Sequence, residues 1–135
     1  MSASSSKYGE KEYPEIALCK RIIGLAFSTV NALGYGYQEK YYQRAFAELL
    51  RSEGVKFQRA VCVPLMIGER TIGRYFIDFV VENRVVVEIK IANAIHLRHM
   101  HQVLGYLAST GLPIGLLLLI TKNSVRIRRV ILTSR

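Results

Sequence analysis

Apolar side chains recur every three or four residues in the first third of the chain, which is the period of an amphipathic helix. This spacing predicts a first helix over 15–33, whose inward positions are Ile16, Cys19, Ile23, Ala26, Val30 and Leu33. A Gly-Tyr-Gly triplet at 34–36 interrupts the helix. A second helix is predicted over 38–52, with Tyr42, Phe46, Leu49 and Leu50 facing inward.

The apolar period changes to two after residue 55, which indicates β-strands. Three strands are predicted in succession, at 56–67, 74–81 and 85–92, with a turn over 68–73. Helical spacing returns over 95–109, through Leu97, Met100, Leu104 and Leu107. Two further strands are predicted at 114–121, where the run is apolar on both faces, and at 125–132.

The predicted order of elements is α-α-β-β-β-α-β-β. A strand meander followed by a crossover helix implies an α/β fold with a mixed central sheet flanked by helices. Residues 15–135 are expected to form one domain, preceded by a flexible polar tail at 1–14. The longest apolar run, 113–120, is too short to span a bilayer, and the tail lacks the apolar segment of a secretory signal. We therefore expect a cytoplasmic protein with no membrane partner.

Basic residues outnumber acidic ones by nineteen to ten, which gives a formal net charge of +9 and an isoelectric point near 9.8. Such an excess suits a polyanionic partner, above all a nucleic acid. Solubility would also explain it, so the charge alone does not decide the function. Cys19 and Cys62 lie far apart without metal-ligand spacing, which fits reduced thiols.

Two charged side chains interrupt the apolar strand predicted at 85–92. Glu88 and Lys90 lie two residues apart, so both point to the same face of a strand. Burying charges there is costly unless they are paired or bind a metal. Asp78 is a similar exception in the preceding strand, where Ile77 and Phe79 flank it.

The loop between these two strands decides whether the two acids can meet, because directly opposed residues of antiparallel strands share a face. A two-residue loop at 83–84 would place Asp78 opposite Ile89 and separate the acids. A three-residue loop at 82–84, or a bulge, would bring Asp78 and Glu88 onto one face. A shared site therefore predicts one of these two irregular arrangements.

Two carboxylates on one face repel each other unless a cation lies between them, and hard oxygen ligands suit Mg²⁺ or Mn²⁺. A metal there would polarise a phosphodiester and activate an attacking water. Lys90 would orient that water or stabilise the transition state. The structural alternative is a salt bridge of Lys90 with Asp78 or Glu88 on a solvent-facing side of the sheet, since short patterns of this kind also occur by chance.

Asp78, followed by Glu88-Ile89-Lys90 on the next strand, resembles the PD-(D/E)xK, or restriction-endonuclease-like, nuclease superfamily. The order of elements over roughly 15–132 is similar too. The resemblance implies that Asp78, Glu88 and the Ile89 carbonyl bind a divalent metal and that Lys90 is the catalytic lysine. The sequence departs from the pattern where Ile77 replaces a proline and where Ile89 replaces the leucine of many relatives.

Two further motifs carry the same resemblance. Gly36-x-x-Glu39-x-x-Tyr42 resembles the signature of the GxxExxY family within the superfamily, which implies Glu39 as a further carboxylate of the metal site. Glu39 would also stabilise a helix N-terminus without any metal. Gln102 and Tyr106 lie on one helix face and resemble the QxxxY motif of RecB-type nucleases, which lies beside the metal site and the DNA.

His99 lies on the same helix stripe as Gln102, and we expect it to contact a phosphate or a base. His96, His99 and His101 do not all share a helix face and lack cysteine or carboxylate partners at zinc spacing. A zinc site is therefore not expected.

Arginines are expected to bind the nucleic-acid backbone. Arg126 and Arg128 lie on one face of the last predicted strand, and Arg74 lies beside the first hairpin turn. Arginines in such places neutralise phosphates without reading sequence. They would also keep an edge strand from pairing with another sheet.

The sequence thus predicts a metal-dependent nuclease that uses Mg²⁺ or Mn²⁺ to cut DNA with little sequence specificity. RNA stays open as a substrate, as does the choice between internal and terminal cleavage. The alternative is a non-catalytic nucleic-acid-binding module or an accessory subunit of a larger nuclease or defence complex. A homodimer is a further assembly that the small size of the chain would suit.

Overall fold

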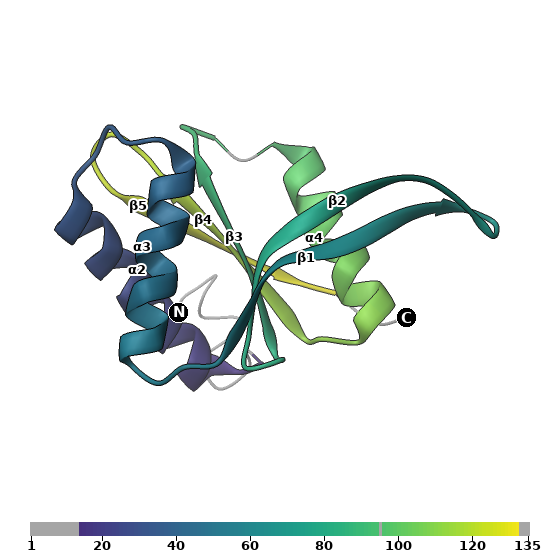
Figure 1. The fold of residues 1–135 in the computed structure, drawn as a ribbon, viewed down its shortest axis with the longest axis horizontal. Coiled ribbons are helices and arrows are strands. Elements are labelled where there is room, and N and C mark those ends of the chain that lie inside the picture. Colours follow the sequence, from purple (N-terminus) through teal and green to yellow (C-terminus); the bar gives the residue numbers. More distant parts are fainter. Residues whose placement is uncertain (1–13, 95, 133–135) are drawn as a thin grey trace, which may run out of the picture.

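The computed structural model describes residues 14–94 and 96–132 (Figure 1). Its elements are α2 (Ile16–Leu33), α3 (Glu39–Ser52), β1 (Phe57–Ile67), β2 (Arg70–Val81), β3 (Val85–Ile91), α4 (Leu97–Thr110), β4 (Ile114–Ile120) and β5 (Val125–Ile131). Their order is the one that the sequence predicted. Of the predicted tail at 1–14, residues 1–13 lie outside the described residues.

The strands form a five-stranded sheet in the order β1-β2-β3-β4-β5. β3 and β4 are parallel because α4 crosses between them, while the other neighbouring pairs are antiparallel. The mixed central sheet that the sequence predicted is therefore confirmed.

Each face of the sheet carries its own hydrophobic cluster. α2 and α3 pack on the face that presents Val87 and Ile89 of β3. α4 packs on the opposite face, against Val86 of β3 and Leu117 of β4. Side chains alternate between the two faces of a strand, so Glu88 and Lys90 belong to the α4 face.

The core face of α2 is shifted from the predicted one. Its buried residues are Leu18, Cys19, Ile22, Ala26 and Thr29. The predicted Ile23, Val30 and Leu33 flank this stripe and are only partly buried. Thr29 tolerates burial because its hydroxyl donates a hydrogen bond to the Leu25 carbonyl at 2.8 Å. In α3, the predicted inward residue Leu49 is half-buried, whereas Leu50 is fully buried.

The predicted turn at 68–73 was too long. The turn comprises Gly68 and Glu69, and β2 already begins at Arg70. Arg74 therefore lies within the strand rather than beside the turn. The positive φ of Gly68 (58°) suits a tight two-residue hairpin turn.

The β1–β2 hairpin extends well beyond the rest of the sheet. β1 pairs with β2 from Phe57↔Val81 to Ile67↔Arg70, whereas the ladder between β2 and β3 runs from Phe79↔Val87 to Val81↔Val85. Residues 61–77, which we call the arm, therefore continue as a two-stranded ribbon. Figure 1 shows this ribbon curving away from the sheet past α4.

α2 is long and apolar enough to cross a membrane by length and composition, with a mean hydropathy of 1.4 over 18 residues. In this fold one of its faces, including Cys19 and Ile22, is buried against the sheet. A core helix of a folded domain passes the same test, so this finding is weak evidence for a membrane span.

The two cysteines should differ in reactivity. Cys19 is buried, and burial raises its pKa to about 11, whereas Cys62 is exposed on the arm. Because the thiolate is the reactive form, a disulfide reagent at pH 8 should modify one thiol rapidly in the native protein and both in urea. A Cys62→Ser variant should lose the fast reaction. Rapid modification of Cys19 in that variant would contradict the described packing of α2.

Candidate active site

The loop between β2 and β3 settles the register question. Val81 pairs with Val85, which leaves the three residues 82–84 as the loop. Glu82 and Asn83 have φ values of 52° and 56°, and the Arg84 amide donates to the Val81 carbonyl at 2.9 Å. The same register places Asp78 opposite Glu88, so of the two predicted arrangements, a three-residue loop or a bulge, the loop is the one that joins these strands.

β2 turns away from β3 at Asp78. Phe79 packs in the cluster of α2 and α3, whereas Ile77 packs in the cluster of α4. Two residues apart in a regular strand they would share a face, so the strand twists sharply between them. Across from this point, Ala60 of β1 has a φ of 52°, which marks the same irregularity on the partner strand.

Where β2 and β3 diverge, backbone amides have no partner on the neighbouring strand, and carboxylates accept their hydrogen bonds instead. The Ile89 amide donates to Oδ2 of Asp78 at 2.8 Å, and the Asp78 amide donates to Oε1 of Glu88 at 3.0 Å. The Ile91 amide donates to Oε1 of Glu39 at 3.2 Å. The structure thus brings together three predicted acids, from β2, β3 and the first residue of α3.

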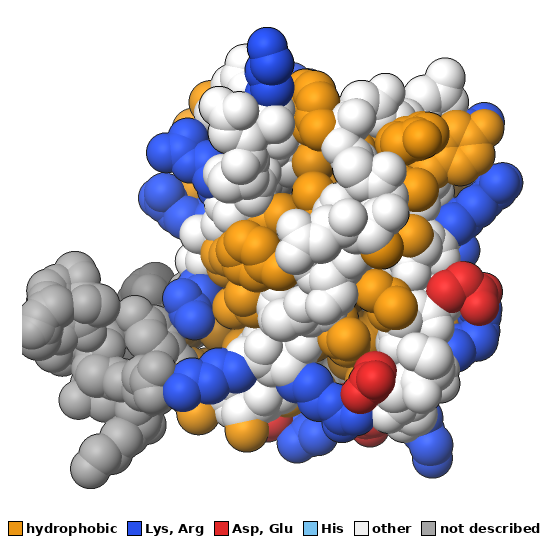
Figure 2. Space-filling view, turned by 90° about the vertical axis from the view of Figure 1, so that its left-hand side faces the viewer, with side chains coloured by type: hydrophobic (Ala, Val, Ile, Leu, Met, Phe, Trp, Pro, Cys, Tyr) orange, Lys and Arg blue, Asp and Glu red, His pale blue; other side chains and the backbone are white. Residues whose placement is uncertain are grey.

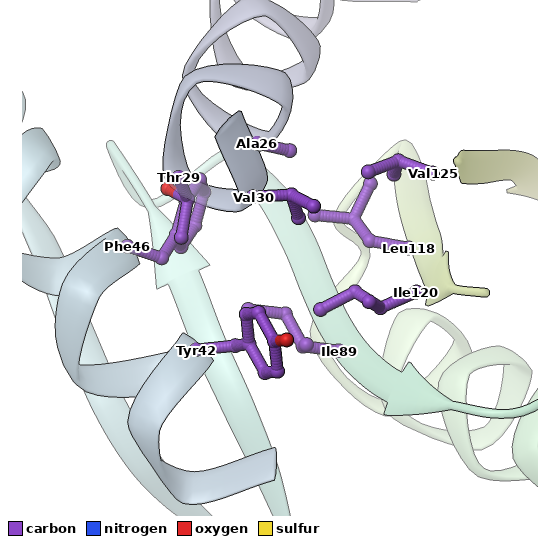
Figure 3. Close-up of a pocket in the computed structure, with 9 residues that line it drawn as sticks. All are labelled: Ala26, Thr29, Val30, Tyr42, Phe46, Ile89, Leu118, Ile120 and Val125. Carbon is purple, nitrogen blue, oxygen red and sulfur yellow. The ribbon is translucent and has the colours of Figure 1, made fainter. Parts of the chain in front are cut away.

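The Ile89 carbonyl faces the same gap. The N–H and C=O groups of one strand residue point to the same neighbouring strand, and the Ile89 amide points at Asp78. Its side chain lies on the α2 and α3 face of the sheet and lines a small apolar cavity together with Tyr42 and Phe46 (Figure 3). The cavity has a volume of about 10 Å³, room for about one water molecule, so it is a small gap in the packing and not a substrate site.

Glu88 is a buried acid with an unusual proton affinity. Its side chain is 1% exposed. Burial raises its pKa to about 8, and the nearby charge of Asp78 and a hydrogen bond between the two carboxyl groups contribute to the rise. The hydrogen bond from the Asp78 amide and the charge of Lys90 oppose this rise in pKa. A cation between the carboxyl groups would replace the proton that Glu88 otherwise holds near neutral pH.

Lys90 stands two residues beyond Glu88 on the same face. Its Nζ lies 3.9 Å from Oε2 of Glu39, and its side chain is partly exposed. The structural alternative paired Lys90 with Asp78 or Glu88, but the ion pair that the described residues show is with Glu39. Lys90 therefore holds a positive charge at the mouth of the carboxylate cluster.

The Gly36-x-x-Glu39-x-x-Tyr42 motif has a direct structural explanation. Gly36 has a φ of 113°, which favours glycine, and Glu39 begins α3. Tyr42 lies one turn later and is fully buried. Its hydroxyl donates to the Gly34 carbonyl at 2.5 Å and accepts from the Tyr37 amide at 3.4 Å. Tyr42 thereby fixes the turn that places Glu39 beside the other acids.

α4 approaches the site through Tyr75, a residue that the sequence analysis missed. The Tyr75 hydroxyl donates to the Gln102 carbonyl at 2.9 Å, and a Cβ at Gly105 would lie 3.3 Å from that hydroxyl. Burial and the charge of Glu88 raise the pKa of Tyr75. Tyr75 therefore lies close to both the acids and α4. The position of Tyr75 in the sequence, three residues before Asp78, could have suggested a role in the site. The twist of β2 at Asp78 is not visible in the sequence, so the direction of the Tyr75 side chain could not be predicted.

Of the predicted α4 residues, His99 shows an electrostatic link to the site. His99 is half-buried, and burial and the charge of Lys90 lower its pKa, so it lies near that lysine and favours the neutral form. Gln102 and Tyr106 are half-buried, and burial raises the pKa of Tyr106. Among the described residues, no side-chain hydrogen bond joins Gln102 or Tyr106 to the three acids.

Arg126 and Arg128 are exposed and share the α4 face of the sheet with the site. The register aligns Lys90 with Leu119 and Leu119 with Arg126, so two strand spacings, about 10 Å, separate Lys90 from Arg126. The Arg126 guanidinium donates to the Asn93 carbonyl at 3.5 Å. A hollow of about 330 Å³ opens beside these arginines. Arg74 is exposed on the arm, on the other side of the site.

The donor set fits a hard divalent cation. Asp78, Glu88 and Glu39 supply carboxylates, and Ile89 supplies a backbone carbonyl, which are the ligands that Mg²⁺ and Mn²⁺ prefer. In residues 14–94 and 96–132, no three His, Cys, Asp or Glu side chains surround a common point closely enough to hold a metal as they stand. One oxygen of each acid caps a backbone amide, and the second oxygen of each is the remaining donor.

The chain belongs to the PD-(D/E)XK nuclease superfamily, whose family model matches residues 17–130. A solved structure titled "Crystal structure of SSO0001" shares the fold with a TM-score of 0.55 and 17% sequence identity. The alignment covers 89% of this chain and 62% of that one, so this chain spans less than two thirds of the solved protein. Among curated proteins, no significant match is found.

The raised pKa of Glu88 predicts a pH-dependent stability in the metal-free protein. Glu88 stays protonated in the folded state up to about pH 8 but ionises near pH 4.5 when unfolded. The folded state then binds more protons between these values, so the free energy of unfolding should fall as pH rises from 5 to 8. In urea titrations with EDTA, Glu88→Gln should flatten this fall, which is on the order of a few kcal/mol.

Glu48→Gln is the matched control, because Glu48 is an exposed acid paired with Arg51. Its stability should follow the wild-type pH dependence. Equal slopes for wild type and Glu88→Gln would show that Glu88 is ionised in the folded protein.

The hydroxyl of Tyr42 should contribute to stability through its two hydrogen bonds. Tyr42→Phe should lower the free energy of unfolding by about 1–2 kcal/mol, because it leaves the Gly34 carbonyl without its partner. Tyr41→Phe, on the adjacent exposed tyrosine, should change it by less than about 0.5 kcal/mol. Urea denaturation measures both. A neutral Tyr42→Phe would mean that the turn does not depend on this bond.

Proposed function

We propose that the chain hydrolyses phosphodiester bonds in DNA at the site formed by Asp78, Glu88, Glu39 and Lys90, with Mg²⁺ or Mn²⁺ as cofactor. The observation that carries this proposal is the meeting of the three acids and Lys90 in the gap between β2 and β3. Membership of the nuclease superfamily supports the reaction class.

The carboxylates of Asp78, Glu88 and Glu39 and the Ile89 carbonyl would hold the metal. When bound, such an ion would supply Lewis-acid polarisation of the phosphate and would lower the pKa of an attacking water. The burial of Glu88 keeps bulk water away from this end of the site, which strengthens the electrostatic interactions there.

Lys90 acts on the substrate as a positive charge. Its partial exposure lets the ammonium reach a phosphate oxygen, and its pairing with Glu39 limits where it can go. An ammonium in this place donates hydrogen bonds to the attacking water or to the phosphate, whose negative charge grows in the transition state. His99, Gln102 and Tyr106 line the α4 side and contact the backbone or bases of the substrate.

The substrate backbone lies along the α4 face. Arg126 and Arg128 on one side and Arg74 on the other bind phosphates without selecting a sequence. The net charge of +9 supports this assignment. RNA would make the same phosphate contacts, so it is tested as a second substrate in the same assay. In this proposal the protein acts in the cytoplasm. It acts as a monomer, as a homodimer or within a larger nuclease complex. We assign it to the GxxExxY family of the superfamily.

One observation favours the second candidate, a non-catalytic nucleic-acid-binding subunit. Each of the three acids already accepts a hydrogen bond from a backbone amide, which gives it a structural role without any metal. The two candidates make opposite predictions for cleavage.

End-labelled single- and double-stranded DNA, and RNA, should be cut in Mg²⁺ or Mn²⁺ and left intact in EDTA. Lys90→Met should lower the cleavage rate by about 100-fold or more while DNA binding changes little, because the lysine acts mainly in the transition state. Arg51→Met is the matched control, since Arg51 pairs with Glu48 on the surface of α3. Tight DNA binding without cleavage in any metal would instead support the accessory subunit.

A further inference from the structure

The far half of the arm exposes large apolar side chains. Ile67 and Ile72 are 66% and 65% exposed, and Leu65 and Met66 are 45% and 46% exposed. In Figure 1 the ribbon that carries them stands clear of the helices. Exposed apolar residues grouped on a projecting ribbon are a hazard for aggregation, so their presence indicates a binding surface.

The charges on the arm indicate a polyanion as the occupant. Arg70 and Arg74 lie between and beside these apolar residues, and Glu69 is the acid at the tip. Neither arginine forms an ion pair with another residue in the described part of the chain. A second copy of this chain, with a net charge of +9, would bring like charges together at the arm, whereas a nucleic acid would neutralise them.

The dimensions of the arm match a duplex. At about 3.4 Å per residue, the six steps from Val61 to Ile67 span roughly 20 Å, close to the width of a DNA helix. A two-stranded ribbon fits into the major groove, and apolar side chains of architectural proteins enter the minor groove as wedges.

The arm also begins at the catalytic residues. β2 runs directly from Arg74 through Phe76 to Asp78, and the inner face of the arm, with Val63 and Tyr75, packs with α4. The outer face carries Cys62 opposite Phe76 and Pro64 opposite Arg74. Phe76 is 56% exposed there. A duplex whose backbone reaches Asp78 would therefore extend along this ribbon. Figure 2, which views the opposite end of the molecule, shows basic side chains spread around an apolar area there.

We propose that the arm is a second nucleic-acid-binding element, which lies in a groove of double-stranded nucleic acid and inserts Met66, Ile67 and Ile72 against its sugars and bases. This inference rests on the proposed function, because it takes the substrate to be a nucleic acid. The inference adds one property of the substrate, which is that a duplex segment long enough to hold the arm in its groove lies next to the scissile bond.

Binding is measured by fluorescence anisotropy with a 20-base-pair duplex and a single strand of the same sequence, in EDTA. The combined variant Met66→Ser, Ile67→Ser and Ile72→Ser should bind the duplex at least tenfold more weakly, while its affinity for the single strand changes less than threefold. Leu132→Ser, at an exposed residue beyond the end of β5, is the control and should bind both as wild type does. Arg70→Ala with Arg74→Ala should reduce the salt slope for the duplex by about two.

Cys62 offers a direct probe of contact. It is exposed on the outer face of the arm while Cys19 is buried, so an environment-sensitive fluorophore can be attached selectively. Duplex addition should shift the emission of the label. An unchanged emission at saturating duplex, or duplex affinity that the serine variant retains, would overturn the proposal.

Light scattering, which measures the oligomeric state, tests whether a second copy of the chain occupies the arm instead. A wild-type dimer that becomes monomeric in the serine variant, with duplex affinity unchanged, would assign the arm to a second copy of the chain and overturn the proposal. Failure of the proposed hydrolysis has a different signature. The wild type would then cut no substrate, while the arm variants would still lose duplex affinity.

Discussion

Strand β3 runs on past the point where β2 leaves it, and the amides of Ile89 and Ile91 then need acceptors other than a strand. Buried backbone donors are almost always satisfied, and leaving one without a partner costs about 1–3 kcal/mol. Asp78 and Glu39 supply these acceptors. The same divergence that opens the sheet therefore requires hydrogen-bond acceptors in the gap, and in this chain they are carboxylates. The side chains that accept the backbone hydrogen bonds are therefore the same ones that would bind a cation.

The burial of Glu88 is the second part of this arrangement. A fully buried acid beside another acid is unfavourable when both are ionised, and the raised pKa of Glu88 expresses that cost. The strand residues on either side of Glu88, Val87 and Ile89, are buried as well. A cation bound between the two carboxyl groups would offset that cost, which links the burial of Glu88 to the proposed metal site.

The sequence predicted the order of the elements and the mixed sheet, because both follow from the hydrophobic period. For the connection between β2 and β3 it predicted either a three-residue loop or a bulge, on the condition that Asp78 and Glu88 share a face. It did not predict the length of the arm. The residues around Ile72 are exposed and lack the apolar alternation of a half-buried strand, so the segment was predicted to be a turn. It also missed Tyr75. The strand twists at Asp78, so alternation counted from Phe79 places Tyr75 on the wrong face.

A crystal structure of the protein grown with Mn²⁺, with anomalous data collected at the manganese edge, tests the central claim most directly. We predict an anomalous peak between the carboxylates of Asp78 and Glu88, within bonding distance of the Ile89 carbonyl, and no such peak in Glu88→Gln. A peak elsewhere, or ordered carboxylates with no peak at saturating Mn²⁺, would mean that the acids serve the backbone alone.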